Sequence, residues 1–218
     1  MPYFLLVMLI ILIPQLLIHS RYRKYSQIEV LNGKTGEEIV YAMLHSNGVY
    51  NVEVERIGGV LSDHYDSRSK KIRLSNDNFE NPTIASIAVA AHETGHALQD
   101  SKGYFFLKLR HSMGPLTMTA SQASWVFLIL GMILYFSPFV WFGIILFSVV
   151  VLFDLVTLPV EINASKRAKQ YLLSTGAYND EEMEGVSKVL NAAALTYVAA
   201  TLASILQLIR LISRFRRD

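Results

Sequence analysis

The chain has 218 residues, of which 52% are hydrophobic and 17% are charged, and its formal net charge is +2. This composition is more apolar than that of an ordinary soluble domain, so we expect one functional unit with part of its surface in lipid. The weak and scattered positive charge argues against a nucleic-acid partner. Because the chain has no cysteine, any metal ion must be bound by histidine and carboxylate side chains.

An apolar run covers residues 3–19 and is long enough to cross a bilayer. The basic residues Arg21, Arg23 and Lys24 follow this run. A secretory signal peptide carries its basic residues before the apolar part, so the order favours a retained membrane anchor.

Three more apolar segments come later in the chain. Residues 116–136 and 139–160 flank a tight turn at Ser137 and Pro138, which predicts a transmembrane hairpin. Residues 190–212 are apolar again and predict a last membrane helix. We therefore expect three to four transmembrane helices.

The region between the anchor and the hairpin has a different pattern. Apolar residues alternate on both sides of the turn-rich stretch 62–69, which predicts a small β-hairpin or ribbon within residues 52–74. An Asn-Pro-Thr sequence then precedes an alanine-rich segment, which predicts a helix over residues 83–100.

That predicted helix contains His92-Glu93-Thr94-Gly95-His96. Two histidines four residues apart lie on one face of an α-helix, where they can bind one zinc ion. Glu93 lies beside this face and is the candidate general base rather than a ligand. An exposed polar helix is the alternative, but the segment is nearly apolar outside the motif, which favours zinc.

A catalytic zinc site usually has three protein ligands and one open position. The best candidate for the third ligand is Glu161, at the end of the third apolar segment. Two membrane crossings separate it from His96, so both lie on the same side. As an alternative, Glu161 is an interfacial residue that only ends a transmembrane helix.

Three further residues are weaker candidates. His64 and Tyr65, in the expected turn, are candidate stabilisers of the transition state, although a histidine in a surface turn is more often solvated. Asp154 lies seven residues before Glu161 on nearly the same helix face. It is either functional or a structural hydrogen-bond partner of a neighbouring helix.

Three stretches together resemble the YugP-type family of membrane zinc metallopeptidases, in order and approximate spacing. They are residues 90–99, residues 62–66 with 71–75, and residues 158–165. The resemblance covers most of the chain and implies a gluzincin-like site in which Glu161 is the third ligand.

More distantly, the layout is similar to HtpX-type proteases and CAAX prenyl proteases, which pair an H-E-x-x-H helix with a downstream Glu-x-x-Ala. In those families an aspartate usually follows the alanine, whereas this chain has Ser165. Ser165 and Asn163 are therefore candidates for supporting the histidine ligands.

These features predict a mainly α-helical membrane protein with a zincin-like helix and a small β-ribbon. The expected segments are an anchor (1–20), a zincin-like region (21–115), a transmembrane hairpin (116–160), a helix and loop with the third ligand (161–189), and a C-terminal membrane helix with a basic tail (190–218).

The predicted activity is that of a zinc endopeptidase with one Zn²⁺ per chain, which hydrolyses a peptide or membrane-protein substrate with zinc-activated water. An intramembrane protease with its zinc at mid-bilayer is a rival, but the apolar stretch 84–91 is too short to span. The other rival is a membrane scaffold or chaperone-like protein with a structural zinc. Such a zinc normally has four protein ligands, and no fourth ligand is evident by spacing.

Basic residues predict the orientation of this multi-pass protein in the cell membrane. The clusters at residues 21–24 and at Lys166, Arg167 and Lys169 place the zinc site on the cytoplasmic side. The basic tail opposes this orientation if the last helix crosses fully; its residues are Arg214, Arg216 and Arg217.

Overall fold

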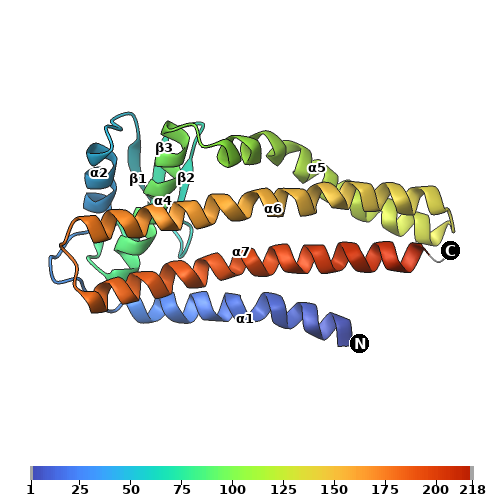
Figure 1. Ribbon diagram of the computed structural model, residues 1–218, viewed down its shortest axis with the longest axis horizontal. Helices are drawn as coiled ribbons and strands as arrows, with labels where there is room; N and C mark the ends of the chain where they lie inside the picture. The colour runs from blue at the N-terminus through green and yellow to red at the C-terminus, as the bar shows by residue number, and fades with distance from the viewer. Residues whose placement is uncertain (1, 217–218) are drawn as a thin grey trace. The chain divides into compact units, whose positions relative to one another are not determined.

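The computed structural model describes residues 2–216, so Arg217 of the basic tail lies outside the described residues. The protein is mainly helical, with one small sheet (Figure 1). In chain order the elements are α1 (Pro2–Tyr25), α2 (Gly36–Ser46), β1 (Glu53–Ile57), β2 (His64–Asp66), β3 (Lys71–Ser75), α3 (Asn76–Glu80), α4 (Ile84–Ser101), α5 (Phe105–Ile133), α6 (Ser137–Ser174) and α7 (Asp180–Phe215).

The chain divides into two compact units. We call one the helical unit; it comprises Met1–Ile13, Phe105–Pro159 and Thr196–Asp218. We call the other the mixed unit; it comprises Pro14–Tyr104 and Val160–Leu195. The segment boundaries expected after residues 160 and 189 fall inside α6 and α7, because each of these helices continues without a break from one unit into the other.

Within residues 2–216, four helices are long and apolar enough to cross a membrane, namely α1, α5, α6 and α7. Their apolar side chains are largely exposed: in the most apolar window of α1 no residue is buried. Among the described residues of the helical unit, Leu128, Val140 and Ile144 form a small buried apolar cluster, against residues of α7. Helices that expose so much apolar surface are typical of a protein surrounded by lipid.

The sheet of the mixed unit has the strand order β1-β3-β2. Strand β3 alternates regularly, so Ile72 and Leu74 are fully buried while Lys71 and Arg73 point away from the core. On that outer face Lys71 and Arg73 both form ion pairs with Glu55 of β1. The central strand is thus fixed by apolar burial on one face and by cross-strand charge pairs on the other.

The expected ribbon is only partly correct. The strands that flank the turn-rich stretch, β1 and β3, pair in parallel and not as a hairpin. The hairpin instead joins β3 to β2, which lies inside the stretch 62–69 expected to be a turn. Short strands are weakly marked in a sequence, and parallel pairing depends on non-local contacts that local alternation does not reveal.

Helix α4 lies at the centre of the mixed unit and contacts α2, α3, β2 and β3. It contains five alanines and one glycine, and nearly every position from Ile84 to Gln99 is buried. Small side chains on all faces allow other elements to approach closely from every side. The helix begins where the side chain of Thr83 accepts a hydrogen bond from the backbone N–H of Ser86.

Candidate metal centre

Helix α4 carries two of the three side chains that converge in the mixed unit. His92 and His96 are one helical turn apart, and their rings meet edge to face with centroids 4.8 Å apart. His96 is buried and His92 is largely buried. The helix therefore presents both imidazoles on one face, as the four-residue spacing predicts.

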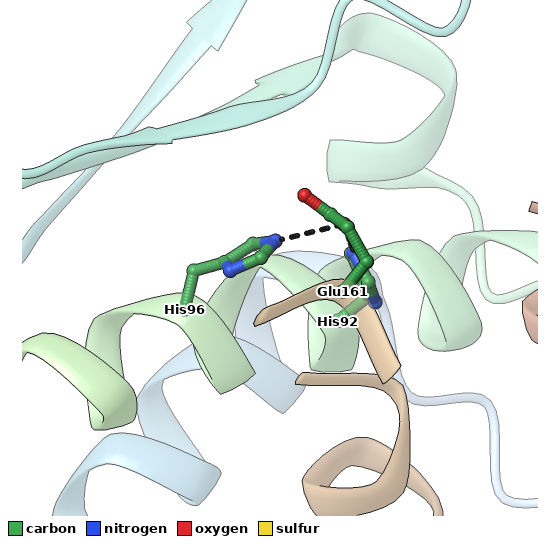
Figure 2. Close-up of side chains that lie close together, drawn as sticks. All are labelled: His92, His96 and Glu161. Carbon is green, nitrogen blue, oxygen red and sulfur yellow. Dashed lines mark hydrogen bonds and ion pairs between the residues drawn. The ribbon is translucent and has the colours of Figure 1, made fainter. Parts of the chain in front are cut away.

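Helix α6 supplies the third side chain, Glu161, which is almost completely buried. Its Oε2 lies 3.3 Å from Nε2 of His92 and 3.4 Å from Nε2 of His96. Figure 2 shows the carboxylate of Glu161 extending across to the two imidazoles. The structure thus brings together three side chains from two helices, and Glu161 follows His92 by 69 residues and His96 by 65 residues in sequence.

Gly95 allows α6 to approach this closely. A Cβ atom at position 95 would lie 2.7 Å from the backbone oxygen of Ala164, well inside contact distance. Ala164 is three residues after Glu161, on the same side of α6. The glycine in the middle of the motif therefore lets the backbone of α6 pass directly against α4 and places Glu161 beside the histidines.

His92, His96 and Glu161 could together hold a metal ion; among residues 2–216 no other group of His, Asp or Glu side chains has this arrangement. A tetrahedral zinc with bonds of about 2.0–2.1 Å keeps its ligand atoms about 3.3–3.4 Å apart. The two nitrogen–oxygen distances of 3.3 and 3.4 Å agree with that spacing. The donor set, two imidazoles and one carboxylate, also suits a catalytic zinc.

Glu93 follows His92 directly in the sequence of α4, and it is buried. Burial raises the pKa of Glu93 to about 7, and the charges of Glu161 and Asp63 act in the same direction. His92 and a hydrogen bond from the backbone N–H of Tyr65 act in the opposite direction. Glu93 therefore lies next to the metal-binding group and below strand β2, with its carboxylate held by the strand backbone.

The far nitrogens of both imidazoles also have partners. Nδ1 of His92 lies 3.1 Å from the hydroxyl of Ser165, and Nδ1 of His96 lies 3.0 Å from Oε1 of Gln99. Asn163 contacts Gln99 and does not touch a histidine directly. Sequence reasoning did not assign a role to Gln99, although its position three residues after His96 puts it on the same helix face.

Tyr65 and His64 lie on β2 but do not turn their side chains to the metal-binding group. The hydroxyl of Tyr65 donates a 2.6 Å hydrogen bond to Asp100, and burial together with this carboxylate raises the pKa of Tyr65 well above its usual range. The ring of His64 is exposed, with Nδ1 2.8 Å from the backbone oxygen of Ser62. Only the backbone of Tyr65 reaches the site, through Glu93.

Asp154 belongs to the helical unit, whereas the three converging side chains belong to the mixed unit. Its carboxyl group is hydrogen-bonded to Ser204 of α7. Its backbone oxygen accepts a 3.4 Å hydrogen bond from Thr201, also in α7. These contacts connect two neighbouring helices.

Comparisons with known proteins place the chain in a family. The chain is 45% identical to a protein of Bacillus subtilis (strain 168) named "Putative membrane protease YugP", over 201 residues that cover 92% of this chain and 89% of that protein. No solved structure is significantly similar to this chain. Residues 1–216 match the family described as "Putative neutral zinc metallopeptidase". With nearly its whole length matched, the chain belongs to this family of zinc metallopeptidases.

Proposed function

We propose that this protein is a multi-pass membrane endopeptidase that binds one zinc ion per chain through His92, His96 and Glu161. The observation that carries the proposal is the convergence of these ligand atoms at tetrahedral spacing, with Glu93 buried next to them. The zinc metallopeptidase family and the membrane helices support it. A gluzincin-like arrangement, with an H-E-x-x-H helix and a downstream glutamate, describes this ligand set.

Zinc bound there would supply a Lewis acid that polarises a carbonyl group and makes water more acidic. Glu93 would act as the general base: its carboxylate takes a proton from the attacking water and then gives it to the leaving amine. The hydrogen bond from the Tyr65 N–H orients that carboxylate. Because Glu93 is buried, few water molecules other than the reacting one can reach its carboxylate.

Strand β2 is the proposed substrate-binding edge. In the sheet order β1-β3-β2 it pairs with β3 on one side only, and its backbone lies against Glu93. An extended peptide can add to such an edge through main-chain hydrogen bonds. This placement would bring a scissile peptide bond of a peptide or membrane-protein substrate near the metal.

The mechanism is tested by zinc content and peptide hydrolysis of the full-length protein in detergent. Glu93→Gln is expected to keep stoichiometric zinc and to lose activity by about 10²–10⁴-fold, because the ligands remain while the base is lost. Glu161→Ala is expected to lose both zinc and activity. Glu184→Ala, an exposed glutamate on α7, is the matched control and should retain both.

Substantial hydrolysis by Glu93→Gln would contradict the proposed mechanism. A wild-type protein that binds zinc firmly but cleaves no peptide in any assay would instead favour the alternative of a membrane scaffold with a structural zinc. These two outcomes are distinct because the first concerns the base and the second concerns the activity of the intact site.

We also propose that the metal centre faces the cytoplasm, because basic residues follow the apolar parts of both α1 and α6. The chain has no cysteine, so single reporter cysteines can be introduced without background. Ser69→Cys, in the exposed turn before β3, should react with a membrane-impermeant thiol reagent only after cells are permeabilised. Ser137→Cys, also exposed, should react in intact cells; the reverse pattern would invert the topology.

A further inference from the structure

Gln99 is a completely buried amide near the C-terminal end of α4. A buried amide is costly unless its donors and acceptor are paired. Its Oε1 lies 3.0 Å from Nδ1 of His96, and its Nε2 donates to the backbone oxygen of Val160 at 2.8 Å and to Oδ1 of Asn163 at 3.0 Å. Gln99 therefore links His96 on α4 to two residues on α6.

The chemistry of the partners fixes which way this amide points. The backbone oxygen of Val160 can only accept a hydrogen bond, so the NH₂ group of Gln99 must face it. Asn163 also presents its oxygen, because Nε of Arg167 can only donate and does so to Oδ1 at 2.8 Å. With its NH₂ group directed to α6, Gln99 turns its oxygen to His96.

The orientation of Gln99 determines the tautomer of His96. An amide oxygen can only accept, so Nδ1 of His96 must carry the proton. In the neutral imidazole Nε2 is then the nitrogen without a proton, and it lies 3.4 Å from Glu161. This tautomer directs the lone pair needed for a metal bond to the centre of the ligand group.

We propose that Gln99 is the positioning residue of the metal centre. It fixes the tautomer and orientation of His96, and it ties this imidazole to the turn of α6 that carries Glu161, since Val160 and Asn163 lie on either side of that glutamate. The inference rests on the proposed function, because it assigns Gln99 a role in holding the same zinc. Arg167 and Asn163 act at the outer end of this hydrogen-bonded chain.

His92 provides an internal comparison. Its Nδ1 is paired with the hydroxyl of Ser165, which can donate or accept and can rotate. Ser165 therefore supports the ring of His92 without determining which of its nitrogens carries the proton. Of the two partners, Gln99 and Ser165, only Gln99 determines which nitrogen of its histidine carries the proton.

The test measures the zinc dissociation constant of the full-length protein in detergent, by competition with a chromophoric chelator, together with the melting temperature of the metal-free protein. Gln99→Met keeps the length of the side chain but removes its hydrogen bonds, and it should weaken zinc binding about 10–100-fold. Gln99→Glu retains an acceptor for the Nδ1 proton of His96 but loses the bonds to α6, so its zinc affinity should fall between those of the wild type and Gln99→Met. Gln170→Met, at an exposed position on α6, is the matched control and should change neither quantity.

The two Gln99 variants separate positioning from a purely structural role. A carboxylate cannot donate to Val160, so metal-free Gln99→Glu should melt below the wild type although it binds zinc more tightly than Gln99→Met. Equal loss of zinc affinity in both variants would overturn the proposal, and so would wild-type affinity in Gln99→Met.

If Gln99→Met does not fold, Arg167→Met tests the same chain from its partly exposed end. It should weaken zinc binding measurably, and an unchanged dissociation constant would overturn the proposal. If the wild type binds zinc and hydrolyses peptides while Gln99→Met has the same zinc affinity, only the positioning role is refuted. A wild type that binds no zinc refutes the proposed function and this role with it.

Discussion

The two compact units differ in the ionisable and amide side chains that they bury. In the mixed unit the buried set includes Glu93, His96, Gln99 and Glu161, and the contacts of these groups join α4 to α6 and to β2. In the helical unit the buried cluster is small and apolar, and large side chains such as Phe142 are exposed. The difference indicates that one unit holds buried polar groups in place, whereas the other exposes an apolar surface that suits contact with lipid.

The largest expected effect comes from removing one of the proposed metal ligands in the mixed unit. His96→Ala should abolish stoichiometric zinc binding and hydrolysis, because two remaining ligands hold zinc poorly. His111→Ala, in α5 of the helical unit, should retain both. Metal analysis of the two purified proteins checks the comparison, and full zinc occupancy in His96→Ala would show that the site lies elsewhere.

Substitutions of glycine should also differ between the units. Gly95→Ala forces a Cβ atom to 2.7 Å from the backbone oxygen of Ala164, so it should destabilise the protein by about 1–3 kcal/mol and weaken zinc binding. Gly114→Ala in α5 meets no atom within 4 Å beyond its chain neighbours and its own helix, so it should cost less stability than Gly95→Ala and leave zinc binding unchanged. Thermal unfolding in detergent, with and without zinc, measures both; equal behaviour of the two variants would contradict the close approach of α4 and α6.

The hydroxyl of Tyr65 is expected to contribute to stability and not to catalysis. Tyr65→Phe loses the hydrogen bond to Asp100 and should destabilise the mixed unit by about 1–2 kcal/mol while leaving kcat nearly unchanged. Tyr135→Phe, at the most exposed large side chain of the helical unit, should change neither quantity. A fall of about 100-fold in the kcat of Tyr65→Phe would instead assign the hydroxyl to the transition state.

The smallest effect is expected from Asp154→Asn in the helical unit. Asparagine can keep a hydrogen bond to Ser204, and the residue lies outside the unit that contains the metal-binding group. Zinc affinity and kcat should therefore remain close to those of the wild type. Loss of either would show that the helical unit contributes a charge to the chemistry, and the comparison between the units would fail.

Much of the fold follows from local pattern, and the sheet marks where this stops. The length and composition of the apolar segments predicted membrane helices, and the structure has four helices of that kind. The alternation of Ile72 and Leu74 correctly predicted a strand with one buried face. The parallel pairing of β1 with β3 was missed, because its energy comes from contacts between separate segments and not from either segment alone.

For the candidate site, the sequence by itself determined the face of one helix. A four-residue spacing of His92 and His96 puts both imidazoles on one side of α4 whatever the rest of the chain does. Glu161 could be selected as a partner because a carboxylate at the end of an apolar segment needs compensation.

Only the tertiary structure decided how these groups are supported. It shows that Gly95 opens the space for α6, that the hydroxyl of Tyr65 is committed to Asp100, and that Gln99 rather than Asn163 contacts His96. Such contacts depend on the distance and orientation of two helices that are separated in sequence but packed against each other in space. Helical periodicity fixes which residues share a face, but the packing of one helix against another fixes which atoms on that face come within hydrogen-bonding distance.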